Sequence, residues 1–98
     1  MYYFVYILFS RKLNRFYIGQ TNDIIKRFDR HNKGFEKFTS KGLPWILLWN
    51  TKKSTRSEAI ILETKLKNLN RKRLIELMKK YNDGISNHDE LLFIEQLS

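Results

Sequence analysis

Five side chains that could do chemistry are spread along the first two thirds of the chain: Tyr6, Tyr17, Arg27, His31 and Glu63. Tyrosine, histidine and glutamate can move protons, a carboxylate can ligate a hard cation, and arginine can stabilise negative charge. Glu63 falls within the apolar stripe of its predicted helix, so its carboxylate must be paired, protonated or ligating.

Each of these residues also has a structural interpretation. Tyrosines suit half-buried sheet surfaces, and Arg27 with His31 could form a solvated helix edge. Glu63 and Lys67 could form an ordinary ion pair one helical turn apart. The case for chemistry therefore depends on whether the fold brings these residues together.

The two tyrosines belong to a predicted antiparallel hairpin. Residues 2–9 form an unbroken β-branched and aromatic run, typical of a central strand covered on both faces, and residues 15–20 are again strand-like. If the loop between them holds an even number of residues, Tyr6 and Tyr17 project from the same face.

The predicted helices would position the other candidates. Thr21 or Asn22 would cap a first helix that ends at Lys33-Gly34, with Arg27 and His31 one turn apart beside its buried face. Residues 44–49 form a third strand, in which Trp45 and Trp49 share one face by parity and belong to the core. Further helices are predicted at 56–69, capped by Ser54 or Thr55, at 70–82 and at 86–98. The fold class is α/β, a small three-stranded antiparallel sheet flanked by helices.

The charge of the chain is strongly asymmetric. Nineteen Lys and Arg against ten Asp and Glu give a net charge of +9, and all nineteen cations lie before residue 81. A basic body of this kind favours a polyanionic partner, nucleic acid above all. An anionic membrane is disfavoured because the bases are spread over several elements, and residues 2–9 are too short to cross a bilayer. The absence of cysteine excludes thiolate metal sites and thiol nucleophiles and fits a cytoplasmic protein.

The order and spacing of the candidate residues resembles the GIY-YIG endonucleases, in particular the compact single-domain branch similar to the nuclease domain found in bacterial nucleotide-excision repair. The resemblance covers roughly residues 2–80. Its marks are Val5-Tyr6-Ile7, Tyr17-Ile18-Gly19 with its tyrosine eleven residues after Tyr6, Thr21-Asn22-Asp23, Arg27 with His31 and Asn32, Phe38-Thr39 before Pro44, Thr55-Arg56-Ser57-Glu58-Ala59, and Glu63 four residues before Lys67.

This resemblance implies metal-dependent hydrolysis of phosphodiester bonds in DNA. Glu63 matches the family's single ligand for Mg²⁺ or Mn²⁺, and Arg27 would stabilise charge on the phosphate. Tyr6 matches the proposed general base or proton relay, although a free tyrosine, with a pKa of about 10, needs nearby cations to favour its phenolate. Tyr17 would position water or phosphate, and His31 would assist proton transfer or orient Tyr6.

Two positions depart from the family pattern. The first tripeptide keeps only its tyrosine, and Phe38 stands where relatives often have tyrosine, which removes a hydroxyl. A late asparagine of other branches has no secure match here. The acidic segment after Ser86 lies beyond the resemblance, so we expect a nuclease-like domain over 1–83 and a C-terminal helix within 84–98 that packs on it or extends from it.

Two alternatives to an active nuclease remain open: a catalytically silent nucleic-acid-binding module with the same fold, and an interaction protein whose residues 86–98 recruit a partner or pair two copies. Weak sequence preference is expected, because so small a basic domain offers little beyond phosphate contacts. The expected phosphate-binding residues are Lys52, Lys53, Arg56, Lys67, Arg71, Lys72 and Arg73.

Overall fold

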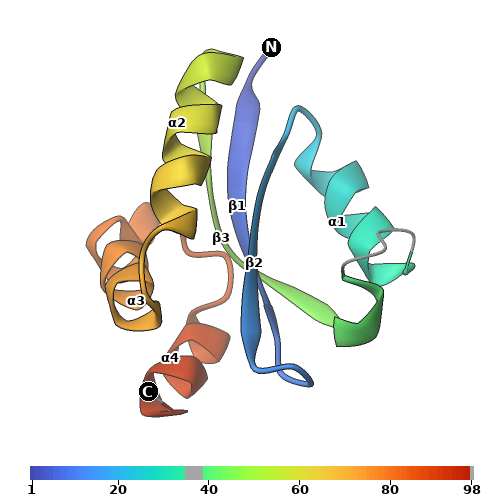
Figure 1. Ribbon diagram of the computed structural model, residues 1–98, viewed down its shortest axis with the longest axis vertical. Coiled ribbons are helices and arrows are strands. Elements are labelled where there is room, and N and C mark those ends of the chain that lie inside the picture. Colours follow the sequence, from blue (N-terminus) through green and yellow to red (C-terminus); the bar gives the residue numbers. More distant parts are fainter. Residues whose placement is uncertain (35–38, 98) are drawn as a thin grey trace.

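A three-stranded antiparallel sheet forms the centre of the protein. The computed structural model describes residues 1–34 and 39–97. Strands β1 (Tyr3–Ser10), β2 (Arg15–Thr21) and β3 (Trp45–Lys53) lie in the order β2-β1-β3 (Figure 1). The central position of β1 is thus confirmed, and its continuous apolar run is explained because Val5 to Phe9 are buried on both faces of the sheet.

Helices cover the two faces of this sheet unequally. Helix α1 (Ile24–Asn32) lies on one face, while α2 (Arg56–Lys67) and α3 (Arg71–Lys80) cover the other, with α4 (His88–Leu97) near the sheet's lower end (Figure 1). Short 3₁₀ turns occur at Ser40–Gly42 and Asn82–Gly84. The larger core lies between the sheet and α2, α3 and α4, whereas the smaller one, on the α1 face, is built around Tyr6, Leu8 and Trp45. The predicted fold class is confirmed.

The helix starts follow from side chains that accept hydrogen bonds from the first turn. The prediction that Thr21 or Asn22 caps α1 is wrong, because Asp23 accepts the hydrogen bond from the Lys26 amide. Thr21 instead accepts a hydrogen bond from the Asp23 amide, which fixes the turn before the helix. For α2, Thr55 is the capping residue: its hydroxyl accepts a hydrogen bond from the Glu58 amide and donates one to the Glu58 carboxylate.

A bulge in β3 reverses the expected side-chain parity of that strand. The register with β1 shifts between Ile7, which pairs with Trp49, and Leu8, which pairs with Leu47. One extra residue turns all later side chains to the other face. Trp45 and Trp49 are both buried, but they lie in different cores, so the prediction that they share one face is wrong.

The C-terminal helix packs on the large core and is tied to the hairpin. Leu91 and Ile94 are buried there, and Arg11 forms a bidentate ion pair with the nearly buried Glu90, with N–O distances of 2.6 and 2.8 Å. This hydrogen bonding raises the pKa of the Arg11 guanidinium. A second ion pair joins Lys79 to Glu95 at 2.7 Å. Leu91, Ile94 and Glu90 are thus engaged within the chain, whereas Leu92 and Leu97 of the same helix stay exposed.

None of the helices in the described ranges is both long and apolar enough to cross a membrane.

Candidate active site

The hairpin brings Tyr6 and Tyr17 to the same face of the sheet. Tyr6 pairs with Gly19 and Leu8 pairs with Tyr17, so the parity expected for an even loop is confirmed. The ring centroids of the two tyrosines are 6.5 Å apart. Gly19 leaves room for the Tyr6 ring, because a Cβ there would lie 2.5 Å from the Tyr6 hydroxyl oxygen. The glycine of the Tyr17-Ile18-Gly19 motif is therefore a packing requirement of Tyr6.

Helix α1 places His31 directly over these tyrosines. Its Nε2 lies 3.1 Å from the Tyr6 hydroxyl, and its ring centroid lies 5.0 Å from that of Tyr17. The helical pattern placed His31 beside the buried face, but the side chain is fully buried and is the most buried residue of α1. A pattern based on apolar residues misses a histidine whose ring nitrogens are both satisfied by hydrogen bonds.

Thr39 completes a buried chain of hydrogen bonds. Its Oγ1 lies 2.9 Å from His31 Nδ1, and its carbonyl accepts a hydrogen bond of 2.6 Å from the indole of Trp45. A neutral imidazole donates at one nitrogen and accepts at the other. With the proton on Nδ1, His31 donates to Thr39, and its Nε2 accepts from the Tyr6 hydroxyl. From the sequence, Thr39 had no predicted role beyond its place in a motif, and the neighbouring Phe38 lies outside the described residues.

The two tyrosines differ in their access to solvent. Tyr6 is 1% exposed, whereas Tyr17 is only partly buried. A substrate phosphate or an attacking water therefore meets Tyr17 before it meets Tyr6. This arrangement favours a relay role for Tyr6 over direct activation of bulk water.

Glu63 lies across the sheet from this cluster, on α2. Its side chain is 18% exposed, and its Oε2 lies 2.9 Å from the ammonium group of Lys67. Of the three states allowed for a carboxylate in an apolar stripe, the structure shows the paired one. Lys67 and Tyr17 line one open pocket beside β2.

Arg27 is partly exposed on α1, one turn before His31. Within the described part of the chain, no hydrogen bond or ion pair joins Arg27 or Glu63 to the tyrosines and histidine. The structure thus brings three of the five candidates into contact and leaves Arg27 and Glu63 on elements that cover opposite faces of the sheet.

A cation at this site would have few protein ligands. Among the described residues no group of three or more His, Cys, Asp or Glu is close enough to hold a metal ion. A single, mostly buried carboxylate suits Mg²⁺, which keeps most of its waters and is often held by one or two carboxylates together with substrate phosphates. The donor chemistry of Glu63 therefore fits a hydrated divalent cation, provided that Lys67 shares or releases the carboxylate.

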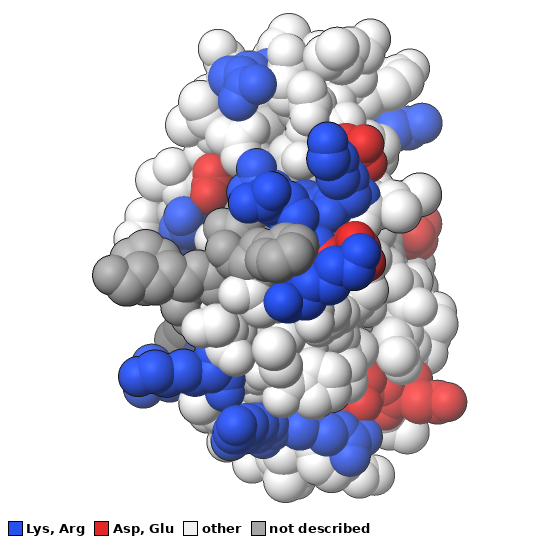
Figure 2. Space-filling model, turned by 90° about the vertical axis from the view of Figure 1, so that its right-hand side faces the viewer, with Lys and Arg blue, Asp and Glu red and all other residues white. Residues whose placement is uncertain are grey.

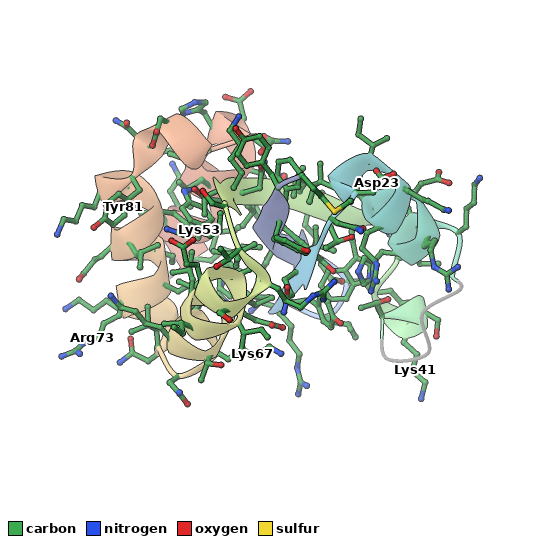
Figure 3. All side chains as sticks on the ribbon, turned by 90° about the horizontal axis from the view of Figure 1, so that it is seen from above. Asp23, Lys41, Lys53, Lys67, Arg73 and Tyr81 are labelled. Atoms are coloured by element: carbon green, nitrogen blue, oxygen red, sulfur yellow. The ribbon has the colours of Figure 1, made fainter. Side chains whose placement is uncertain are left out.

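The predicted phosphate-binding residues do not form one surface. Lys52 lies over the Tyr2 ring, while Lys53 projects to the opposite face, near Trp49, because neighbouring strand residues alternate. Arg56 lies over Tyr3. Lys67 and Arg73 extend from the outer sides of α2 and α3 (Figure 3). Arg71, at the start of α3 with the exposed Lys72 and Arg73, is bound to Asn14.

A second group of cations lies on the α1 face, and only Arg27 among them was a candidate from the sequence. Figure 2 shows Lys and Arg side chains gathered in the middle of this face, interrupted by acidic side chains. The helix contributes Lys26, Arg27, Arg30 and Lys33, of which Lys33 pairs with Asp29 at 2.9 Å. The spacing of these cations along one predicted helix was the signal that could have identified them.

Comparisons with known proteins bear on the family and the fold of the chain. The family model of the GIY-YIG catalytic domain matches residues 2–82. The solution structure of the UPF0213 protein BH0048 from Bacillus halodurans is similar, with a TM-score of 0.54 and 29% identity over 81% of this chain and 84% of that chain. No curated protein matches the chain. The match to the family model covers both tyrosine motifs, α1 and Glu63, so the chain belongs to the GIY-YIG family, a family of endonucleases.

Proposed function

We propose that this protein is a metal-dependent endonuclease that hydrolyses phosphodiester bonds in DNA and selects its substrate by structure more than by sequence. The observation that carries the proposal is the buried chain from Tyr6 through His31 to Thr39, next to the partly exposed Tyr17. Membership of an endonuclease family and the net charge of +9 support it.

Burying this chain of polar groups costs free energy, and packing alone does not explain why polar side chains occupy these positions. Burying a hydroxyl and an imidazole is unfavourable unless they are hydrogen-bonded, and apolar residues would fill the same space without that requirement. Such an arrangement does provide a route for a proton. Nε2 of His31 can accept the proton of the Tyr6 hydroxyl, while Thr39 holds the ring in the required tautomer. Tyr6 can in turn take a proton from a water that Tyr17 orients.

The remaining two candidates would bring positive charge to the phosphate, Arg27 directly and Glu63 through a bound cation. Glu63 would hold the Mg²⁺ or Mn²⁺ ion, which stabilises charge on the phosphate and the leaving oxygen when bound. Arg27 adds a second positive charge from the α1 side. Because the two lie on opposite sides of the sheet, the phosphate would be held at the outer edge of β2, between α1 and α2.

Two observations favour the alternative, a catalytically silent binding module. Tyr6 is almost fully buried, and Glu63 is already neutralised by Lys67. A protein that only binds nucleic acid would tolerate both features without further movement. An active enzyme must free the Glu63 carboxylate and admit water to the tyrosines.

The deciding experiment compares DNA cleavage by the wild-type protein, Glu63→Gln and Glu76→Gln. The panel holds labelled single-stranded, duplex, flap and branched DNA and structured RNA, in Mg²⁺ or Mn²⁺ and in EDTA. Glu76 is an exposed acid on α3, so its variant has the same charge change away from the site. We expect cleavage that needs metal and is lost only in Glu63→Gln. Binding without cleavage across the panel would favour the silent module.

A further inference from the structure

An open pocket runs along the outer edge of β2, between this strand and the junction of α2 and α3. We name it the β2 groove. Its volume is about 470 Å³, within the range of about 300–1,000 Å³ that is common for small-molecule sites. The candidate site residue Tyr17 forms part of its wall, and so does Lys67, the ion-pair partner of Glu63.

The groove combines an apolar floor with a cationic rim. Leu66 and Leu74 are almost fully buried and form the floor together with Phe16, Ile18 and Leu69. The rim carries three cations, of which Arg15 and Lys67 are exposed. A double helix offers phosphates and polar groove edges to a protein, but its stacked bases offer almost no apolar face. An apolar floor beneath cations therefore fits a nucleotide whose base is unpaired.

The third cation of the rim is held in place before any ligand binds. Arg71 donates to the backbone carbonyl and the side-chain oxygen of Asn14, at 3.3 and 3.0 Å. Its guanidinium carbon lies 5.3 Å from the centre of the Phe16 ring. Asn14 itself lies in the hairpin turn with a positive φ of 52°. A guanidinium fixed in this way loses little side-chain entropy when it meets a phosphate.

We propose that the β2 groove binds one unpaired nucleotide next to the phosphate that is cut, with its base on the apolar floor and its phosphate on Arg15, Lys67 and Arg71. The substrate class is then DNA with an unpaired nucleotide, such as a bulge, a flap or a frayed end. This inference rests on the nucleic-acid function proposed above, but not on catalysis. A peptide strand paired with the edge of β2 is the competing occupant, and the cationic rim disfavours it for most peptides.

The test measures binding in EDTA, so that cleavage plays no part. The probes are a fluorescein-labelled duplex that is fully paired and the same duplex with one unpaired adenine, followed by fluorescence anisotropy. We expect the wild-type protein to bind the bulged duplex about tenfold more tightly, a difference of about 1.4 kcal/mol. Leu69→Gln keeps the net charge but makes this part of the floor polar, and we expect it to abolish this preference while affinity for the paired duplex changes little.

A charge-matched pair of variants keeps the test decisive if Leu69→Gln does not fold. Arg15→Gln removes a rim cation, whereas Arg73→Gln removes a cation on α3 outside the groove. We expect the first to reduce the preference for the bulged duplex and the second to weaken both complexes equally. Equal affinity of the wild-type protein for the two probes, or an unchanged preference in Arg15→Gln, overturns the inference. Binding to neither probe also overturns it and points to the peptide strand.

The outcomes also separate this inference from the proposed nuclease. Cleavage that depends on Glu63, without preference for unpaired nucleotides, would support the proposed nuclease and exclude the β2 groove as a base-binding site. Preferential binding of the bulged duplex without any cleavage would support the β2 groove as a base-binding site and exclude the proposed nuclease activity.

Discussion

Gly19→Ala tests the packing at the centre of the site. A methyl group at this position would lie 2.5 Å from the Tyr6 hydroxyl oxygen and 2.7 Å from Cζ of the same ring. Both distances are far below van der Waals contact, so the ring must move and its hydrogen bond of 3.1 Å to His31 must lengthen or break. Overpacking costs about 1–3 kcal/mol and an unsatisfied buried partner about 1–3 kcal/mol more, so we expect a loss of about 2–6 kcal/mol.

The predicted loss of stability is opposite in sign to the usual effect of replacing a strand glycine by alanine. In a strand without such a contact, replacing glycine by alanine stabilises by about 0.5–1 kcal/mol. Urea titrations give the free energy of unfolding of each protein in a double-mutant cycle. The cycle consists of the wild-type protein, Gly19→Ala, Tyr6→Leu and the double variant. We expect Gly19→Ala to cost much less in the Tyr6→Leu background, where the ring is absent. A Gly19→Ala protein as stable as the wild type would refute the packing described here.

Two further predictions concern buried polar contacts. Thr39→Val keeps the shape but removes the partner of His31 Nδ1, so we expect a loss of about 1–3 kcal/mol in unfolding free energy and, if the enzyme is active, a changed pH profile of cleavage. Thr39→Ser keeps the hydroxyl and should restore the wild-type profile. An unchanged profile in Thr39→Val would show that Thr39 takes no part in the proton relay. Arg11→Met leaves the nearly buried Glu90 without its cation and should lower the melting temperature. The double variant Arg11→Met with Glu90→Met should recover most of the loss, because replacing both members of the pair avoids an unpaired buried charge. An Arg11→Met protein as stable as the wild type would show that α4 does not depend on this ion pair.

The elements of this fold could be predicted because their signals are local. The unbroken apolar run before Ser10 predicted a central strand, and a cap at Ser54 or Thr55 predicted the start of α2. The hairpin pattern predicted that Tyr6 and Tyr17 share a face if the loop is even, which it is. All of these signals depend on backbone geometry over a few residues, which sequence periodicity reports directly.

The bulge in β3 could not be predicted in the same way. It arises from how β3 fits the central strand, where Leu48 is the extra residue between Leu47 and Trp49. Nothing in the local sequence distinguishes Leu48 from its neighbours. The faces of Trp45, Trp49 and Lys53 therefore depended on pairing between strands far apart in the chain.

Sequence by itself determined the inventory of the site: two tyrosines on one face, a helix carrying Arg27 and His31, a carboxylate in an apolar stripe and a large excess of positive charge. Only the tertiary structure decided the contacts. It buried His31 between Tyr6 and Thr39, paired Glu63 with Lys67, and joined Arg11 to Glu90 across 79 positions of the chain. The physical reason is that composition and periodicity report which residues tend to be buried or charged, whereas hydrogen bonds and ion pairs depend on distances of about 3 Å that are set only when separate elements pack together.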